Sequence, residues 1–337
     1  MDKRKKWNMY ERRWKIRNFY FHKVLRQHIF EKYLKKEPVM YYYARKWIHH
    51  KENTNEYIYN ALLSREPFMA ARFGNTELSV MTSILKNRIC GESKENAERL
   101  DKWFSRLITL SGFFPEKQEL ADKFTDLMLD SCKEIDLHAI WHRPMEDFVV
   151  TEYLPHAELT YLTWLEPWYS KKPWTRALAG KKVLVIHPFE ESIQSQYKRR
   201  EQIFPGTDIL PEFELKTLKA VQTISGVKDE RFQDWFEALD YMYCEAMKID
   251  FEIAIIGCGA YGMPLTAKLK KAGKKAIHLG GVTQILFGIK GRRWLESPTA
   301  KIPFNEYWVY PSENETPPNA KDVEVGCYWD YSMKDSK

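Results

Sequence analysis

The stretch FEIAIIGCGAYGMPLTAKLKKAGKKAIHLGGVTQILFGIKGRRW, residues 251–294, carries the strongest structural signal in the chain. It opens with an apolar run from Ile253 to Ile256, which is typical of a strand buried in a parallel sheet. Three glycines follow in a G-x-G-x-x-G arrangement, at Gly257, Gly259 and Gly262. A turn of this composition lets the backbone approach a ligand closely and leads into a helix.

The second half of the stretch completes a strand–turn–helix–strand unit. A helical segment from Met263 to Ala272 stops at Gly273, and a second apolar run from Ala276 to Leu279 ends in the pair Gly280-Gly281. Such a unit places backbone N–H groups and a helix N-terminus at the carboxyl edge of a parallel sheet, where phosphates bind. The pattern predicts an α/β fold, with a Rossmann-like, mostly parallel sheet flanked by helices. It also predicts contact with a nucleotide or another phosphorylated ligand.

Two other interpretations of the glycines stay open. A nicotinamide dinucleotide site needs an acidic residue after the second strand to hold the ribose hydroxyls, and this chain has His278-Leu279-Gly280-Gly281 there. The glycines can also serve only the close packing of helix on strand.

Length and composition indicate a folded protein with a large core. The chain has 337 residues, of which 44% are hydrophobic and 15% aromatic. No apolar run approaches the ~20 residues that cross a bilayer, and no secretory signal is recognisable. The five cysteines are scattered without zinc-ligand spacing, as expected for a reducing, cytoplasmic setting.

The positive charge is concentrated at the N-terminus. Residues 1–50 contain 15 Lys and Arg against 4 Asp and Glu, a net +11, so the rest of the chain carries −4 of the total +7. Residues 3–36 lack Pro and Gly and are expected to form a basic helical extension with Trp7, Tyr10, Trp14, Phe21, Val24 and Leu25 at helical spacing. This extension suits an anionic membrane surface, or it packs its aromatic stripe on the body. The acidic body argues against nucleic acid as a partner.

A second candidate site follows an earlier apolar run. Phe68 to Phe73 is expected to be a buried strand, and polar residues follow its end, at Arg72, Gly74, Asn75 and Glu77. Asn75 and Glu77 are two residues apart, so their oxygens can reach one hard cation such as Mg²⁺ or Mn²⁺, and Arg72 can pair with a phosphate. The alternative is a surface turn in which Glu77 begins the next helix.

The middle of the chain supplies candidates for proton transfer. The run KKVLVI, residues 181–186, predicts a strand closed by His187, and residues 190–203 predict a helix. His187 and Glu190 are candidate general bases at the top of that strand. The same residues can instead cap the turn and favour the helix dipole. Arg292 and Arg293 are candidates for a phosphate clamp. The pair His138 and His142 offers two imidazoles for a metal, but no third ligand is evident.

Two of these segments taken together resemble a known family. ARFGNTEL at 71–78 and IIGCGAYGMPLTAKLKKAGKKAIHLGG at 255–281 resemble the two ends of the bacterial GT-D fold glycosyltransferases, over a span from about residue 60 to about residue 300. The resemblance implies a Rossmann-like domain with an Arg-x-Gly-Asp-x-Glu-like opening, whose acidic pair is tied to a divalent metal and a nucleotide-sugar. Arg72, Gly74 and Glu77 match that opening, whereas Asn75 stands where the family commonly has Asp. This departure keeps an oxygen ligand but removes a charge.

The expected function is therefore sugar transfer from a nucleotide-diphosphate sugar to a surface polysaccharide, such as a capsule, or to a lipid-linked glycan. Glu77, His187 and Glu190 are the expected catalytic residues. The donor would contact Arg72, Gly74, Asn75, Gly257, Gly259, Gly262, Gly280, Gly281, Arg292 and Arg293, and the metal would contact Asn75 and Glu77. The rivals are an NAD(P)-dependent oxidoreductase and a non-catalytic subunit of a polysaccharide assembly complex.

The expected organisation has three parts. Residues 1–55 would form the basic extension, 56–310 the catalytic domain and 311–337 a C-terminal tail. The expected location is the cytoplasm, with peripheral attachment to the membrane through residues 1–36.

Overall fold

The structure is a computed structural model that describes residues 2–20, 24, 29, 30, 32, 33, 39–297 and 300–329. Its centre is a seven-stranded sheet in the order β5-β4-β3-β9-β8-β6-β7, and every neighbouring pair in it is parallel. The strands are β3 (Phe68–Ala71), β4 (Leu137–Ile140), β5 (Glu158–Tyr161), β6 (Lys182–His187), β7 (Glu214–Lys219), β8 (Ile253–Ile256) and β9 (Lys275–His278). The predicted α/β, Rossmann-like class is confirmed.

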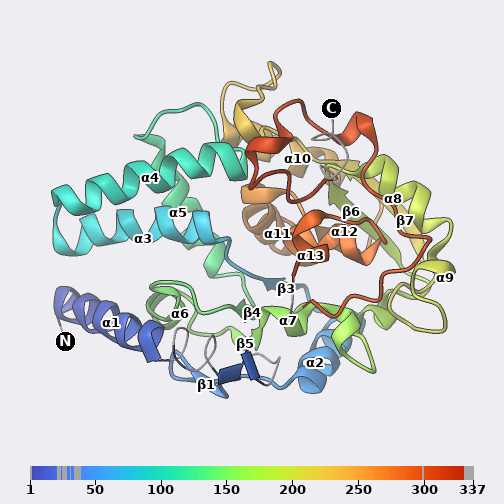
Figure 1. The fold of residues 1–337 in the computed structure, drawn as a ribbon, viewed down its shortest axis with the longest axis horizontal. Helices are drawn as coiled ribbons and strands as arrows, with labels where there is room; N and C mark the ends of the chain where they lie inside the picture. Colours follow the sequence, from blue (N-terminus) through green and yellow to red (C-terminus); the bar gives the residue numbers. More distant parts are fainter. Residues whose placement is uncertain are drawn as a thin grey trace.

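Helices cover both faces of the sheet (Figure 1). The α-helices are α1 (Lys3–Arg17), α2 (Lys51–Leu63), α3 (Asn75–Cys90), α4 (Lys94–Ser111), α5 (Leu120–Cys132), α6 (Glu146–Tyr153), α7 (Leu162–Leu165), α8 (Glu190–Tyr197), α9 (Arg200–Ile203), α10 (Trp235–Met247), α11 (Gly262–Lys271), α12 (Thr283–Leu286) and α13 (Arg292–Leu295). Short 3₁₀ helices are η2 (Pro167–Tyr169), η3 (Trp174–Leu178), η4 (Ile224–Gly226), η5 (Gly259–Tyr261), η6 (Gly280–Val282), η7 (Glu313–Glu315) and η8 (Ala320–Asp322). A two-stranded antiparallel hairpin, β1 (Tyr42–Tyr43) and β2 (Lys46–Trp47), forms a second, separate sheet.

Alternate residues of the central strands pack into two separate hydrophobic cores, one on each face of the sheet. In β8, Ile253 and Ile255 pack into the core shared with α2, α8 and α12, whereas Ala254 and Ile256 pack into the core shared with α3, α4, α5, α10 and α11. Both sets are buried, which explains why such strands appear in the sequence as uninterrupted apolar runs.

The helix expected over residues 190–203 is two helices, α8 and α9. At the break the Tyr197 hydroxyl donates to the Phe213 carbonyl and accepts from the Phe213 N–H, and the two rings pack with centroids 4.5 Å apart. This contact with the chain before β7 outweighs the helical propensity of the run.

The N-terminal helix α1 packs its aromatic residues on the body. Trp7 and Tyr10 are buried, and the Trp7 ring meets Phe148 of α6 edge-on at 4.8 Å. Tyr10 bonds to Thr151, and Lys86 bonds to Glu11. The packed alternative therefore holds for Trp7 and Tyr10, while Phe21 and Leu25 lie outside the described residues.

The C-terminal segment from 311 to 329 contributes several side chains to the core. Val323, Cys327 and Trp329 are buried and belong to the same core as α2 and α8. Residues 330–337 of the expected tail lie outside the described residues. All five cysteines are free thiols.

Burial of Trp7 predicts a large stability effect. Truncation of a fully buried Trp to Ala costs about 3–5 kcal/mol, so Trp7→Ala should lower the free energy of unfolding by that order in urea denaturation. Trp47→Ala is the matched control, because the Trp47 side chain is 73% exposed and its loss should change stability by about 0.5 kcal/mol or less. Equal effects of the two variants would contradict the packing of α1.

Candidate functional site

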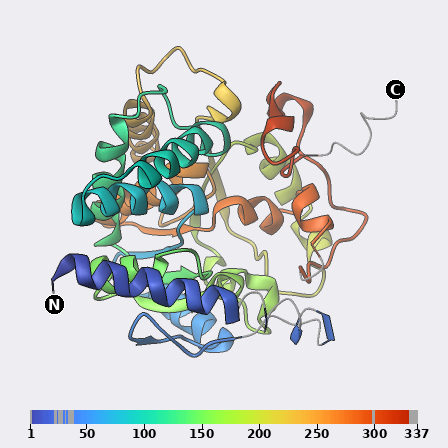
Figure 2. The ribbon, with the colours of Figure 1, turned by 60° about the vertical axis from the view of Figure 1, so that its left-hand side comes forward.

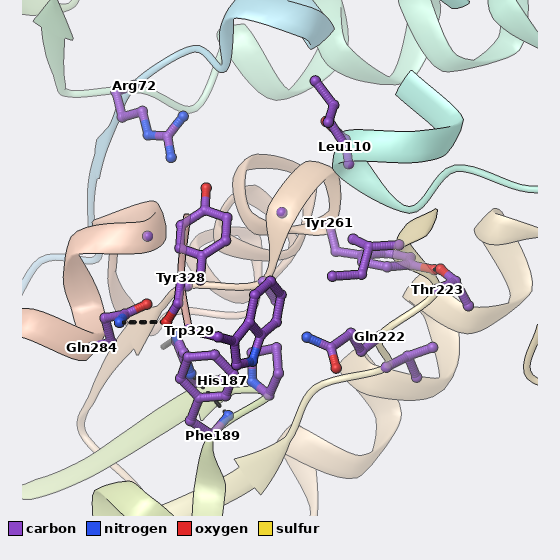
Figure 3. A pocket seen from close by; sticks show the side chains of 18 residues that line it. Arg72, Leu110, His187, Phe189, Gln222, Thr223, Tyr261, Gln284, Tyr328 and Trp329 are labelled. Atoms are coloured by element: carbon purple, nitrogen blue, oxygen red, sulfur yellow. Dashed lines mark hydrogen bonds between the residues drawn. The ribbon is translucent and has the colours of Figure 1, made fainter. Parts of the chain in front are cut away.

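A cavity opens at the carboxyl edge of the sheet, with about 620 Å³ of space that includes part of the open solvent at its mouth (Figure 3). Because all seven strands are parallel, the segments after five of them meet at this edge. The wall contains Arg72 after β3, His187 to Phe189 after β6, Val221 to Ile224 after β7, Gly257 to Gly259 and Tyr261 after β8, and Gly281 and Gln284 after β9. Two segments that are almost 200 residues apart in the sequence, around Arg72 and around Gly257, thus share one cavity.

Arg72 projects its guanidinium into the cavity with few protein partners (Figure 3). Within the described part of the chain it makes one long hydrogen bond, 3.5 Å to the Phe73 carbonyl, and no ion pair. Burial lowers the pKa of Arg72, and the charge of Arg293 acts in the same direction, while Glu77 and Tyr328 oppose them. The group remains a cation, and the shift indicates that a further anion would stabilise it.

The position of Arg72 depends on the bare backbone of Gly280. A Cβ at Gly280 would overlap the guanidinium, and the glycine has a φ of +69°, which other residues rarely adopt. Gly280 therefore serves the site by leaving room for a cation, without itself lining the cavity.

The three glycines after β8 have different surroundings. A Cβ on Gly257 would come within 2.6 Å of both the Gly280 carbonyl and the Thr283 hydroxyl, and Gly259 has a φ of +58°. At Gly262 a Cβ would overlap the imidazole of His278, so this glycine packs α11 on β9. The packing interpretation accounts for Gly262, whereas Gly257 and Gly259 line the cavity.

The segment after Gly74 begins helix α3 and turns its carboxylate inward. Glu77 is 8% exposed, and it folds back over Gly74, where a Cβ would overlap its carboxylate. Asn75 is the first residue of α3, and its backbone carbonyl accepts a hydrogen bond of 2.6 Å from the Ser79 hydroxyl. Neither Asn75 nor Glu77 is among the residues that line the cavity.

The described residues show no cluster of the side chains that most often hold a metal ion. They contain no group of three or more His, Cys, Asp or Glu side chains that could hold an ion. Asn75 and Glu77 offer a single negative charge, and that charge also acts on the pKa of Arg72, which it raises. His138 bonds instead to the buried Glu146 at 3.3 Å, and His142 bonds to Tyr161 at 3.2 Å.

His187 is a neutral hydrogen-bond donor toward the cavity. Its Nδ1 accepts from the Phe189 N–H at 3.0 Å, so the neutral ring carries its proton on Nε2. Burial lowers the pKa of His187 to about 3. This tautomer does not suit the general base that the sequence suggests, because the free nitrogen already holds the proton.

The remaining predicted residues lie outside the cavity wall. Glu190 accepts from the Thr217 hydroxyl at 2.7 Å. Arg292 pairs with Glu296 at 3.5 Å, and Arg293 pairs with Glu324. Arg293 reaches the cavity indirectly, because its guanidinium donates to the Tyr328 hydroxyl at 3.1 Å.

The C-terminal part of the cavity wall is not among the residues predicted from the sequence. Tyr328 and Trp329 line the cavity, and Figure 3 shows the Tyr328 hydroxyl directed toward Arg72. Buried Glu315 fastens this segment, since its carboxylate accepts from the Glu191 and Ser192 N–H groups at the start of α8, and its carbonyl accepts from the Trp329 indole. Other unpredicted wall residues are Leu110, Ser111, Gln222, Thr223, Tyr261 and Gln284.

Comparison with known proteins gives a distant structural likeness. No family model matches the chain, and no curated protein matches it. The chain is similar to a solved structure described as "the highly conserved domain of unknown function 1792", which "has a distinct glycosyltransferase fold", with 15% identity and a TM-score of 0.44 over 86% of this chain and 93% of that one. A selenomethionine structure of domain of unknown function 1792 is similar at 14% identity, with the same TM-score and coverage. This likeness assigns no donor, acceptor or activity to the chain.

The contact between Arg72 and Gly280 generates a test. Gly280→Ala should displace the guanidinium and weaken binding of a nucleoside diphosphate by tenfold or more, roughly the 1.4 kcal/mol or more of one charge-assisted hydrogen bond. Calorimetric titration measures the effect. Gly206→Ala is the control, because Gly206 has the same φ of +69° but no atom within 4 Å of its Cβ position. Similar affinities of the two variants would contradict the role of Gly280.

The neutral His187 predicts a contribution to acid lability. Its folded pKa is about 3, so below pH 6.5 the unfolded chain binds a proton that the folded protein does not. Stability from this group is complete above pH 6.5 and is lost as the pH falls toward 3, by up to about 1.4 kcal/mol per pH unit. His187→Asn keeps an acceptor for the Phe189 N–H, and its unfolding free energy should fall less steeply over this range. Parallel pH curves for variant and wild type would contradict the assignment.

Proposed function

We propose that the protein is a glycosyltransferase that moves a sugar from a nucleotide-diphosphate sugar to a glycan acceptor. The observation that carries the proposal is an under-partnered cation in a cavity without carboxylates. Arg72 enters this cavity, and the residues that line it include no Asp or Glu. A diphosphate provides the charge that this wall lacks.

The rest of the wall suits the nucleoside and sugar portions of such a donor. Phe189, Tyr261 and Tyr328 supply aromatic surface, while Gln222 and Thr223 supply hydrogen-bonding groups. The backbone at Gly257 and Gly259 approaches the same space without side chains.

In the proposed reaction the bond between the anomeric carbon and the diphosphate oxygen breaks. Negative charge grows on the departing nucleotide, and Arg72 stabilises it in a partly dehydrated cavity. The Nε2–H of His187 adds a neutral donor at the edge formed by β6. The acceptor hydroxyl attacks the anomeric carbon and gives up its proton to a base, for which Glu190 stays a candidate from the sequence and Glu77 is a second one.

The role of a divalent cation is open to two routes within this proposal. In the first, Arg72 alone neutralises the leaving group, and the asparagine at position 75 reflects the lack of a metal. In the second, Mg²⁺ or Mn²⁺ arrives with the diphosphate and gains oxygen ligands from Asn75 and Glu77. The one carboxylate present favours the first route.

The rival oxidoreductase is disfavoured by the chemistry of the wall. A nicotinamide dinucleotide needs a carboxylate for its ribose hydroxyls, and neither the end of β9 nor the rest of the cavity wall supplies one. A non-catalytic nucleotide-binding subunit would use the same cavity, so turnover must distinguish it.

The proposal extends to the acceptor and its place in the cell. A surface polysaccharide or a lipid-linked glycan is the expected acceptor, and it would be met by a peripheral enzyme at the inner face of the membrane. Within the described residues, no helix has the length and apolarity to span a bilayer.

The test is a screen of nucleotide sugars for binding and slow hydrolysis, with and without Mn²⁺. We expect at least one nucleoside diphosphate to raise the melting temperature and its sugar to be turned over. Arg72→Gln should lower kcat/KM by about 10²–10³-fold, the loss typical of removing one charge-stabilising donor. Glu77→Gln should lower turnover while the melting temperature stays near that of the wild type.

Three outcomes would contradict parts of the proposal. Stabilisation by NADH and not by nucleoside diphosphates would favour the oxidoreductase. Nucleotide binding with no turnover of any donor, unchanged in Glu77→Gln, would favour a non-catalytic subunit. Loss of turnover in EDTA with recovery in Mn²⁺ would overturn the metal-free route.

A further inference from the structure

Exposed apolar side chains gather in one short part of the chain. Of the fourteen large hydrophobic side chains exposed in the described residues, nine fall between positions 16 and 47. They are Ile16, Phe19, Tyr20, Ile29, Tyr33, Val39, Tyr41, Tyr42 and Trp47. Scattered exposed apolar residues are ordinary on a soluble protein, but a local concentration marks a surface that meets another apolar phase.

The β1–β2 hairpin holds its aromatic residues outward. Tyr42 and Trp47 face each other across the hairpin, with ring centroids 5.3 Å apart and exposures of 52% and 73%. The connection Ala44-Arg45 has a φ of +48° and +66°, a turn that normally uses Asn and Gly. Residues other than glycine adopt such values at some energetic cost, and such strain recurs at functional sites.

The base of the hairpin is fixed to the body. The Lys46 ammonium donates to the carbonyls of Leu154, Pro155 and Ala157 at 2.8, 2.8 and 2.6 Å. Tyr43 is buried, and Ile48 bridges to Leu159 of the edge strand β5. The exposed pair is therefore presented on a rigid support.

Helix α1 adds a basic surface beside the hairpin. With Trp7 and Tyr10 turned inward, its exposed outer face carries Lys3, Arg4, Lys5, Arg12, Arg13 and Lys15 against the single acid Asp2. Arg17 joins the two parts, because its guanidinium lies 4.9 Å from the centre of the Tyr43 ring and 2.9 Å from Asp147. Figure 2 shows α1 and the hairpin at the same lower end of the molecule.

We propose that α1 and the hairpin form a docking surface for an anionic lipid bilayer. The Tyr42–Trp47 pair would sit at the headgroup level, where amphipathic aromatic rings are favoured, and the cations of α1 would meet anionic lipids. Charge complementarity selects this occupant, since residues 51–337 carry a net charge of −4, whereas residues 2–17 hold eight Lys and Arg against Asp2 and Glu11. The aromatic residues of this surface are not the Trp7 and Tyr10 of the stripe that the sequence suggested. They lie in the β1–β2 hairpin, outside residues 1–36.

A bilayer explains both halves of this surface. Nucleic acid would use the cations but would leave the exposed apolar side chains Ile16 and Phe19 without a partner. The inference does not rest on sugar transfer, because it uses neither the cavity nor Arg72.

The experiment is co-sedimentation of the full chain with vesicles of phosphatidylcholine alone and of phosphatidylcholine mixed with phosphatidylglycerol. We expect binding to the anionic vesicles only, weakened by added salt. Arg12→Gln combined with Lys15→Gln should weaken binding roughly five-fold for each charge removed. Tyr42→Ala combined with Trp47→Ala should weaken binding at least tenfold, because the interfacial anchor is lost.

Matched controls separate docking from folding and from charge in general. Lys94→Gln with Lys102→Gln removes two exposed charges on α4, and Tyr307→Ala removes an exposed aromatic elsewhere, so both should bind as the wild type does. The melting temperature and nucleotide affinity of all variants should be unchanged. Three results would overturn the proposal. The wild type could bind vesicles equally well with and without anionic lipid, or the hairpin variant could sediment as the wild type does. The third result is tighter binding to duplex DNA than to vesicles.

Discussion

The guanidinium of Arg72 rests on the bare backbone of Gly280, and the architecture of the site follows from that contact. It exists because β3 and β9 are hydrogen-bonded neighbours in the sheet, although more than 200 residues separate them in the chain. Parallel pairing brings the ends of both strands to one edge, so a cation after β3 and a glycine after β9 are placed together. Gly257 extends the same arrangement, since it lies against the Gly280 carbonyl.

The distribution of charge around this contact limits the chemistry that the cavity supports. The wall holds a cation, neutral amides, hydroxyls and aromatic rings, while carboxylates near it are held elsewhere, as Glu190 is by Thr217. Such a cavity stabilises negative charge and is poorly equipped to accept protons. In the proposed transfer, the proton of the acceptor hydroxyl would therefore pass to a group outside this wall, such as Glu77.

The sequence predicted those parts of the structure that depend on local patterns. The strand at Ile253–Ile256 was predicted with its observed bounds, and the strands near 68, 181 and 276 to within two residues, because strands buried on both faces are continuous apolar runs. Strand β7, ELKTLK, is an edge strand with mixed polarity and shows no such run.

The aromatic stripe of α1 fits a lipid surface as well as a protein core, and the contact of Trp7 with Phe148 distinguishes the two. The wall residues Tyr328 and Trp329 were missed because their place depends on Glu315 reaching α8, which no sequence period encodes.

The attachment of the C-terminal segment by Glu315 has a thermodynamic consequence. The carboxylate of Glu315, which accepts from the first N–H groups of α8, helps to hold Tyr328 and Trp329 at the cavity. A ligand that touches these two rings therefore binds more tightly to the docked form, and by reciprocity its presence tightens the docking. Occupancy of the cavity and protection of residues 311–329 against exchange or proteolysis are two measures of one equilibrium.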